Sequence, residues 1–466
     1  KEETKEFVKL TWYMIPCIVD RPNEKNVMAE INRQLKEKIN AELEFHFIDL
    51  GSYEEKMRVM SAAGDPYDIC LATSWINKIN LNVARGAFAP LNDLLPKYGP
   101  NILRIIEDRW WPAVTYNGKI YAIPNPSNYA QAWGFVFKKD LVEKYNFDYK
   151  NCHTLDDLEP YLEIIKKNEP DIIPLCASPK YTPGLDVTLE LDHVVANIYF
   201  DPQTNKFTPI YDVPRMIAKY KKISEYYKKG YIAKDAATLA DWKEEGKTGR
   251  YAVMSTTGSF TEDGSKSSAE YGFPCVESFI GTTLVSTTSV TSAAIAVSAT
   301  SRNPERAVML IDLMYGDKKF LNLCAFGIEG QDYRVVDGQG TDNPTIEVNS
   351  PYTWVIWANW LGDLYQSYPC INGNTAEALA QMKKDIEMSQ ASPILGFIFD
   401  IEPVKNEVAQ LETINTEFSE ILITGTHPDV DAYLSEFRAR SEAAGIGKVM
   451  AEIERQYNAW KEANKK

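Results

Sequence analysis

Hydrophobic residues in the first 75 positions follow the period of a strand and the period of a helix in turn. Short apolar or alternating runs predict three strands, at residues 8–15, 43–48 and 69–72. Residues 24–40 carry apolar side chains at helical spacing, and Ser52 with Glu55 has the spacing of a capping box that opens a second helix. The pattern therefore predicts a strand–helix–strand–helix–strand order.

This order determines how the predicted strands pair. Strands joined through helices run parallel, because the crossover returns the chain to the same end of the sheet. Ligands of parallel sheets bind beyond the carboxyl ends of the strands. Ser74 and Trp75 follow the third predicted strand, so we expect them at such an edge.

The rest of the chain continues the mixed pattern. Asn117-Gly118 predicts a hairpin turn, and Thr154 with Asp157 predicts a helix start. Asn303-Pro304 opens another predicted helix. Beyond about residue 372 the chain is predicted to be mainly helical, and the last helix repeats apolar side chains on one face at Ile446, Met450, Ile453, Tyr457 and Trp460.

Composition excludes several classes of protein. The 466 residues suggest two or three domains, and no apolar run reaches the roughly 18 residues of a membrane-spanning helix. Acidic residues outnumber basic ones by 65 to 50, and no long Lys/Arg tract is present, so we predict no nucleic-acid partner. The seven cysteines lie far apart, which favours mostly free thiols over a disulfide scaffold and leaves an isolated disulfide open.

Catalytic and metal-binding motifs fail when they are inspected. The four histidines stand singly, and the Gly-Lys-Thr run at 246–248 has Asp241 where a phosphate-binding loop needs glycine. No GxSxG motif is present. We therefore predict no catalytic residue, no metal ligand and no cofactor.

Aromatic residues beside amides are the positive signal. Flat rings cover the apolar faces of sugars while amides and carboxylates bond the hydroxyl groups. One cluster lies in residues 125–133 and a second in 351–360, while Trp75 and Phe260 each end a predicted strand. The candidate ligand-binding residues are Trp75, Asn125, Asn128, Tyr129, Gln131, Trp133, Phe260, Glu329, Trp354, Trp357 and Trp360.

Other interpretations of the same residues stay open. Rings spaced by three, such as Trp354, Trp357 and Trp360, are also typical of a packed helix stripe in a core. A glycoside hydrolase needs two carboxylates, which 65 acids supply many times over, so it is the alternative function. A receptor for peptides or polyanions is a third possibility, and the net charge of −15 disfavours polyanions.

Motifs in one order along nearly the whole chain give a family resemblance. They are AAGDPYDIC at 62–70, YNGKIYAIP at 116–124, a strand followed by Lys-Asp-Leu at 135–145, HTLDDL at 153–158 and GRYAVM at 249–254. The chain resembles an extracellular solute-binding protein, family 1, of a carbohydrate ABC transporter. It departs from the family pattern at Asn117, where Asp is usual, and at Leu155, where Trp is commoner. Segments 326–333, 400–407 and 443–447 resemble the large Gram-positive lipoprotein subgroup with an extra helical C-terminal region.

The resemblance implies an α/β, two-lobe, type II periplasmic-binding-protein-like fold with about three crossovers and a helical C-terminal extension. We expect residues 1–127 and 290–345 in an N-terminal lobe and residues 128–289 and 346–466 in a C-terminal lobe. The implied function is capture of an oligosaccharide, a β-linked xylo-, manno- or gluco-oligomer, by hinge closure and without catalysis. The implied partners are transporter permease subunits, and the protein is expected to be a monomer on the extracellular membrane face, attached by a lipid upstream of Lys1.

Overall fold

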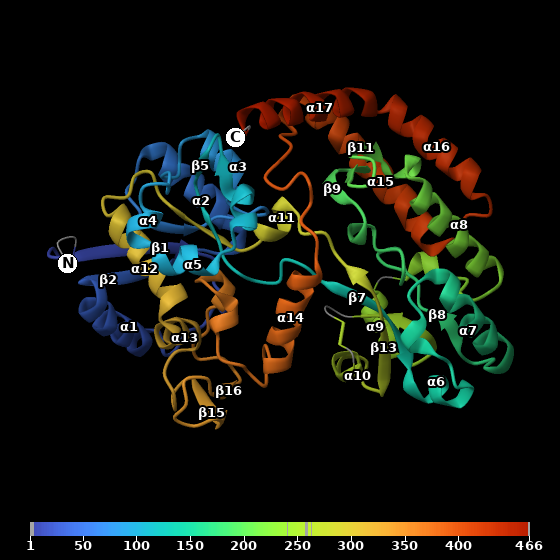
Figure 1. Cartoon of the computed structure of the whole chain (residues 1–466), viewed down its shortest axis with the longest axis horizontal. Helices are drawn as coiled ribbons and strands as arrows, with labels where there is room; N and C mark the ends of the chain where they lie inside the picture. Colours follow the sequence, from blue (N-terminus) through green and yellow to red (C-terminus); the bar gives the residue numbers. More distant parts are fainter. Residues whose placement is uncertain (1–3, 240, 257–259, 262, 465–466) are drawn as a thin grey trace.

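The computed structural model describes residues 4–239, 241–256, 260–261 and 263–464. Two bodies lie side by side and are joined by extended crossover segments (Figure 1). Each body contains its own sheet and its own hydrophobic core. The structure thus has the predicted two-lobe α/β architecture.

The sheet of the N-terminal lobe has five strands in the order β2-β1-β3-β14-β6. They are β1 (Val8–Met14), β2 (Ala41–Phe47), β3 (Ile69–Leu71), β6 (Ile123–Pro124) and β14 (Ala294–Val297). β1 pairs parallel with β2 and β3, while β14 runs antiparallel to both β3 and β6. β6 therefore points the same way as β1 and β3, and the carboxyl ends of these strands share one edge.

Helices pack on this sheet as the apolar periodicity predicts. Val27, Ile31, Leu35 and Ile39 of α1 are all buried. The second helix begins at Leu50 behind Asp49, so the Ser52 capping box does not form. The helical segments are α1 (Glu24–Ile39), α2 (Leu50–Ala63), α3 (Ile79–Ala84), α4 (Leu95–Tyr98), α5 (Pro100–Ile105), η1 (Asp108–Val114), α11 (Thr287–Val290), α12 (Pro304–Gly316), α13 (Lys318–Phe326), η6 (Ala358–Trp360), η7 (Leu364–Gln366) and α14 (Ala376–Met388).

Two small hairpins complete the N-terminal lobe. The first pairs β4 (Thr115–Tyr116) with β5 (Lys119–Ile120), and the second pairs β15 (Tyr333–Asp337) with β16 (Thr345–Val348). Asn117 and Gly118 both have positive φ, 49° and 74°, which is the geometry that a two-residue hairpin turn needs. The predicted turn is confirmed.

The C-terminal lobe is built on a four-stranded sheet in the order β13-β7-β12-β8. Its strands are β7 (Ala132–Lys138), β8 (Ile173–Leu175), β12 (Tyr251–Ser255) and β13 (Cys275–Thr282), and a second sheet holds β9 (Asp192–Val195), β10 (Ile198–Asp201) and β11 (Lys206–Pro209). The helical segments are α6 (Lys139–Tyr145), η2 (Tyr149–Asn151), α7 (Leu155–Asn168), η3 (Val187–Leu189), η4 (Ile210–Asp212), α8 (Pro214–Lys228), η5 (Ala236–Thr238), α9 (Trp242–Lys247) and α10 (Ser265–Tyr271). The Thr154–Asp157 capping box at the start of α7 forms as predicted.

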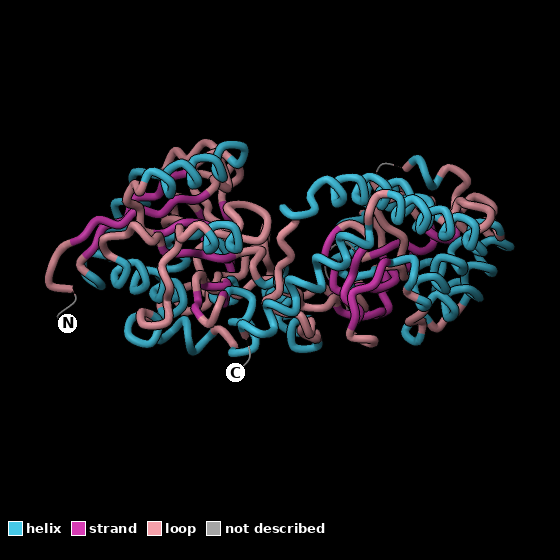
Figure 2. Tube along the Cα trace, turned by 90° about the horizontal axis from the view of Figure 1, so that it is seen from above, coloured by secondary structure: helices cyan, strands magenta, loops and turns pink. Residues whose placement is uncertain are grey.

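A helical extension covers one side of the C-terminal lobe. It consists of η8 (Glu402–Val404), α15 (Lys405–Thr424), α16 (Val430–Ala443) and α17 (Ile446–Ala463). α15 packs against α8, α16 and α17. In Figure 1, α17 runs from the C-terminal lobe toward the N-terminal lobe, and Figure 2 shows the same chain from above with the C-terminal end near the junction.

The three crossovers lie side by side and are joined through their backbones. The Thr283 N–H donates to the Gln131 carbonyl at 2.9 Å, and the Val285 N–H donates to the Gln390 carbonyl at 2.8 Å. The Ser392 N–H then donates back to the Val285 carbonyl, also at 2.8 Å. These bonds form a narrow hinge between the two sheets.

The cores divide the chain differently from the sequence-based expectation. Trp354, Ile356 and Ile386 belong to the core of the N-terminal lobe, although we expected residues 346–466 in the other lobe. Trp354 packs against Phe45 and Phe47 of β2, which fixes this segment on the N-terminal sheet. We therefore propose that the third crossover falls near residues 389–396, after α14.

Candidate functional site

The carboxyl edge of the N-terminal sheet gathers residues from distant parts of the sequence. Cys17 follows β1, Trp75 follows β3 and Asn125 follows β6. Trp357 reaches the same edge, because its backbone N–H donates to the Cys17 Sγ at 3.3 Å. In α/β proteins, this is the edge where ligands bind.

Two indoles at this edge are exposed although they are held firmly. Trp75 is 44% exposed, and its Nε1–H donates to the Ser292 carbonyl at 2.9 Å. Trp357 is 54% exposed and packs against Trp360 with the ring centroids 4.7 Å apart. Large exposed rings with fixed backbones are suited to stacking on a ligand. Burial raises the pKa of the neighbouring Cys17 thiol to about 11, so this thiol remains neutral.

An aromatic cluster forms the facing edge of the C-terminal sheet. β8 and β12 run parallel, and their carboxyl ends meet the beginning of β7, next to the hinge. Trp133 at this point stacks on Tyr181, with centroids 4.8 Å apart and planes 24° apart. Tyr181 in turn contacts Trp242 at 5.3 Å. We call Trp133, Tyr181 and Trp242 the C-lobe cluster.

Three polar atoms lack partners, one in this cluster and two on or just after the neighbouring strands β13 and β12. Trp133 Nε1, Ser278 Oγ and Thr256 Oγ1 are buried and form no hydrogen bond within the part of the chain that the structure describes. A buried polar group without a partner costs about 1–3 kcal/mol, so such groups concentrate where function requires them.

Several predicted site residues prove to be structural. Tyr129 is 3% exposed, packs on Trp110 and donates its hydroxyl to the Pro124 carbonyl. Trp354 is fully buried, with its Nε1–H on the Cys324 carbonyl, and Trp360 is 6% exposed. The prediction that these three rings face a ligand is therefore wrong, because each one fills the N-terminal core.

Two of the predicted polar residues, Asn125 and Glu329, also lie away from a ligand-facing position. Asn125 is fully buried; its amide donates to the Asn359 carbonyl and accepts from the Tyr315 hydroxyl at 2.7 Å, so it cross-links the core. Glu329 is exposed beside the β15–β16 hairpin and accepts from Gln339. Neither side chain has the free hydrogen-bonding capacity at the sheet edge that we expected.

The remaining predicted residues lie near the hinge. Gln131 accepts the hinge hydrogen bond from Thr283, and its own N–H donates to the Thr283 hydroxyl. Asn128 is half-buried, and its Oδ1 has no partner in the described chain. Phe260 is half-buried beside β7, packs on Phe279 and donates its N–H to the Ala132 carbonyl.

Sequence reasoning missed Tyr181 and Trp242. Tyr181 follows β8, so the criterion that selected Trp75, a ring just after a strand, would also have selected it. β8 escaped notice because it has only three residues and contains Pro174. Trp242 begins the short helix α9, just before the Gly-Lys-Thr run at 246–248, and it follows no predicted strand.

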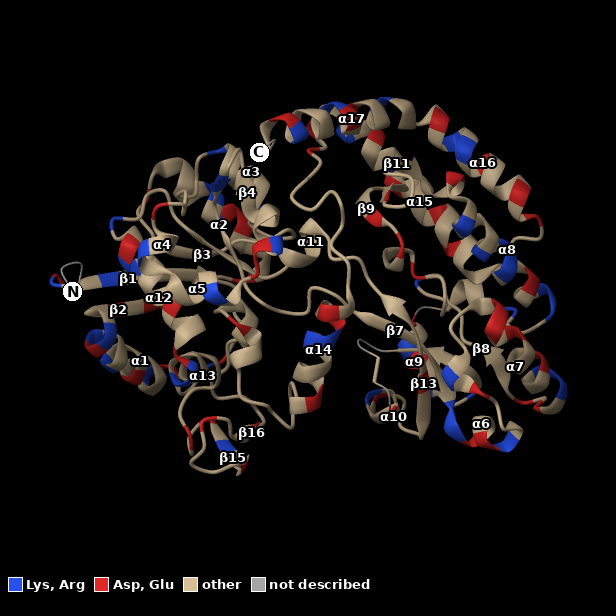
Figure 3. Cartoon of the chain, in the orientation of Figure 1, with Lys and Arg blue, Asp and Glu red and all other residues tan. Residues whose placement is uncertain are grey.

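The C-terminal lobe also contains a cavity that is lined by charged side chains rather than by aromatic rings. It measures about 720 Å³ and lies between α7 and α8, where its lining includes Asp156, Glu190, Lys219 and Lys222. Figure 3 shows charges of both signs along these helices. The cations at its wall are already paired, Lys219 with Glu190 and Lys222 with Asp156.

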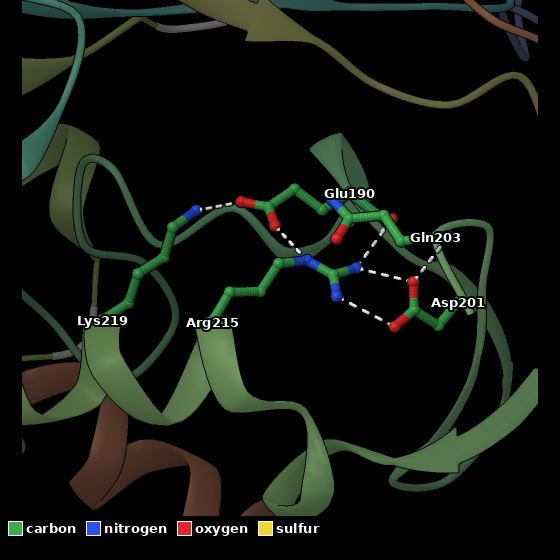
Figure 4. Close-up of polar contacts among 5 residues, drawn as sticks. All are labelled: Glu190, Asp201, Gln203, Arg215 and Lys219. Carbon is green, nitrogen blue, oxygen red and sulfur yellow. Dashed lines mark hydrogen bonds and ion pairs between the residues drawn. The ribbon is translucent and has the colours of Figure 1, made fainter.

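The network beside this cavity ties β10 to α8 (Figure 4). Arg215 donates to both oxygens of Asp201 at 2.9 Å and to Glu190 at 2.5 Å. Burial opposes ionisation of Asp201, but the hydrogen bonds from Arg215 outweigh it and lower the pKa of that carboxyl. These ion pairs stabilise the lobe and commit the side chains of Arg215 and Lys219, while Glu225 also lines the cavity.

The fold, the hinge and the facing edges define a class of two-lobed binding proteins. The model of the family "Bacterial extracellular solute-binding protein" matches residues 22–319, which is more than half of the chain. The chain therefore belongs to the bacterial extracellular solute-binding proteins. Residues 393–462 match a second family model, a domain of unknown function (DUF3502), which coincides with the helical extension.

Individual relatives share this architecture over nearly their whole length. A carbohydrate ABC transporter substrate-binding protein of Streptococcus pneumoniae serotype 4 (strain ATCC BAA-334 / TIGR4) is 28% identical over 95% of this chain and 89% of its own. The crystal structure of the N-glycan transport solute binding protein NgtS from Streptococcus pneumoniae is 26% identical, covers 99% of this chain and 100% of its own, and has a TM-score of 0.77. An extracellular solute-binding protein from Bifidobacterium longum subsp. infantis, 14% identical over 97% of this chain and 98% of its own with a TM-score of 0.64, shares the fold.

These findings decide between the functional classes. The relatives are named for substrate binding in ABC transporters, and such proteins capture a solute without making or breaking a bond in it. The chain is a binding protein and not an enzyme, so the glycoside hydrolase alternative is not supported.

Proposed function

We propose that this protein captures a neutral oligosaccharide for an ABC importer, and that the ligand is a mannose-containing N-glycan fragment. One observation carries the proposal: the exposed indoles of Trp75 and Trp357 lie at the sheet edge of one lobe, and the C-lobe cluster lies at the hinge-facing edge of the other. Structures of NgtS in complex with Man1GlcNAc and with Man5GlcNAc support the choice of ligand class. This ligand class differs from the β-linked xylo-, manno- or gluco-oligomer of the sequence-based expectation and shares only mannose with it.

The chemistry of the rings matches a sugar. An indole face covers the axial C–H groups of a pyranose, while amides and hydroxyl groups bond its rim. The buried polar atoms of Trp133, Ser278 and Thr256 supply one donor and two hydroxyl groups without partners. A ligand rich in hydroxyl groups would restore the hydrogen bonds that these atoms lack.

Closure of the lobes would follow from the position of the hinge. A ligand that contacts both lobes only in the closed form shifts the population toward that form. The three crossovers are thin and extended, so rotation about them leaves both cores intact. The closed form would then dock on the permease subunits of the transporter.

The cellular location and the oligomeric state of the protein are part of the same proposal. Among the described residues, no helix is both long and apolar enough to cross a bilayer. We expect a monomer attached by a lipid at the outer face of the cytoplasmic membrane. Metabolic labelling with a radioactive fatty acid would detect that lipid on the full-length protein, and its absence would contradict the attachment.

Calorimetric titration tests the proposed ligand. The panel contains Man1GlcNAc, Man5GlcNAc, and xylo- and gluco-oligosaccharides of equal length. We expect micromolar or tighter binding of the mannose-containing glycans, which corresponds to about −8 kcal/mol or more, and at least tenfold weaker binding of the others. Heat from the xylo-oligomers alone would overturn the choice of glycan, and no heat from any sugar would overturn the carbohydrate function.

A further inference from the structure

A pocket beside Trp357 lies outside the two sheet edges to which the proposed function assigns the ligand. It measures about 320 Å³ and lies in the N-terminal lobe, where the segment after β16 passes the end of α13. Its lining includes the rings of Tyr352, Trp357 and Tyr368 and the residues Asn359 and Asn374. Trp357 lines this pocket and also lies at the sheet edge, so the pocket adjoins that edge.

Exposed apolar side chains surround the pocket. Tyr352 is 44% exposed, and Ile371, on the same segment, is 52% exposed. The core beneath is complete without them, because Ile346, Val348 and Cys370 are buried there. Exposed rings grouped on a folded surface are typical of a binding site rather than of unfinished packing.

The polar groups of the pocket are neutral, and some of them are free. None of the residues that line it is charged, in contrast to the cavity between α7 and α8. The side-chain amides of Asn359 and Asn374 have no hydrogen-bond partner among the described residues. Rings with uncommitted amides and no charge fit a neutral polyhydroxylated ligand.

We propose that this pocket is an outer subsite that holds the sugar residues beyond the first disaccharide of the bound glycan. The inference rests on the proposed function, and it assigns one occupant, because Trp357 is shared by the sheet edge and the pocket, and a glycan stacked on this ring lies beside the pocket. The subsite then selects for the size and branching of the ligand, while the facing lobe edges bind its inner part.

Tyr352→Ala tests the subsite, and Phe7→Ala is its matched control. Both side chains are 44% exposed, and Phe7 precedes β1, at the opposite end of that strand from Cys17. Calorimetry compares the affinity for Man1GlcNAc with that for Man5GlcNAc. We expect Tyr352→Ala to weaken Man5GlcNAc binding about tenfold and Man1GlcNAc binding less than twofold, as is typical of a lost aromatic contact, whereas Phe7→Ala changes neither.

The outcomes separate the subsite from the proposed function. If the unaltered protein binds both glycans and Tyr352→Ala leaves Man5GlcNAc binding unchanged, or weakens both glycans equally, the subsite is overturned and the proposed function stands. If the unaltered protein binds neither glycan, the proposed function fails and the subsite with it. Asn374→Ala is a second test of the subsite. We expect it to weaken Man5GlcNAc binding about threefold to fivefold and to leave Man1GlcNAc binding unchanged, because it removes one neutral hydrogen bond.

Discussion

Trp75 and Trp354 show how differently one residue type is used in this lobe. The Trp75 ring is 44% exposed and is anchored through its Nε1–H on the Ser292 carbonyl. Trp354 is fully buried between Phe45 and Phe47. The local sequence around the two residues gives no sign of this difference, because burial depends on partners far away along the chain. This is why the sequence could locate the rings but could not divide them between ligand and core.

Substitution of the two indoles separates their roles. We expect Trp75→Ala to weaken glycan binding by tenfold or more and to change the free energy of unfolding by less than about 0.5 kcal/mol. Trp354→Ala leaves a large cavity and is expected to cost about 3–5 kcal/mol of unfolding free energy. Urea denaturation and calorimetry measure both quantities, and unchanged affinity in Trp75→Ala would remove that ring from the site.

A buried carboxyl makes the stability of the C-terminal lobe depend on pH. Glu277 of β13 is 3% exposed and accepts hydrogen bonds from the N–H and the hydroxyl group of Thr261. Burial raises the pKa of Glu277 to about 7. The neutral form is therefore favoured in the folded protein, and its stabilisation is present below the unfolded pKa and lost as pH rises through 7.

Glu277→Gln tests this linkage. In the unaltered protein we expect the free energy of unfolding to fall between about pH 5 and about pH 8, by up to about 3 kcal/mol from this group. The glutamine variant should show a flatter profile, with a residual slope from Asp192, whose pKa burial raises to about 6. Urea denaturation at four pH values measures the slopes, and parallel profiles for the two proteins would contradict the assignment.

Elements with a strong pattern were predicted well. The helix opened by Asn303-Pro304 runs from Pro304 to Gly316, and the capped helix after Thr154 begins at Leu155. Weak or short patterns failed. The indoles spaced by three lie on a loop and the short 3-10 turn η6 rather than on an α-helix, so their spacing did not place them on one face.

The core packing predicted for the last helix, α17, can be tested by substitution. Ile453 of α17 is fully buried in the core of the C-terminal lobe, as its spacing predicted, while the adjacent Glu454 is exposed. We expect Ile453→Ala to lower the free energy of unfolding by about 2–4 kcal/mol and to leave glycan affinity within twofold, because α17 packs on α15 and α16 away from the sheet edge. Glu454→Ala is the control and should change neither quantity. Equal effects of the two substitutions would show that the helix contributes no core packing.

The whole molecule could be predicted only in outline. The family motifs implied two lobes, and the structure shows them, but the assignment of residues 346–395 required the actual packing. That segment crosses no linker of distinct composition, and only the contacts of Trp354 and Ile386 with the N-terminal core reveal its lobe. The same limit applies to the C-lobe cluster, which unites residues from three distant segments.

Lobe closure is the behaviour that the two facing edges predict for the molecule as a whole. A ligand bound by one lobe alone has equal affinity for the open and closed forms and cannot shift their ratio. Saturating Man1GlcNAc should therefore lower the radius of gyration measured by small-angle X-ray scattering. It should also raise the apparent free energy of unfolding by about 2.7 kcal/mol at a hundredfold excess over Kd.

Trp133→Ala separates binding from closure. Removing this ring weakens the C-lobe cluster and leaves Trp75 and Trp357 in place on the N-terminal lobe. We expect weaker but measurable glycan binding, detected by quenching of the remaining tryptophans, without a decrease in the radius of gyration. Full compaction in this variant would mean that the C-terminal lobe recognises its ligand through other residues, because closure needs contacts that only the closed form makes.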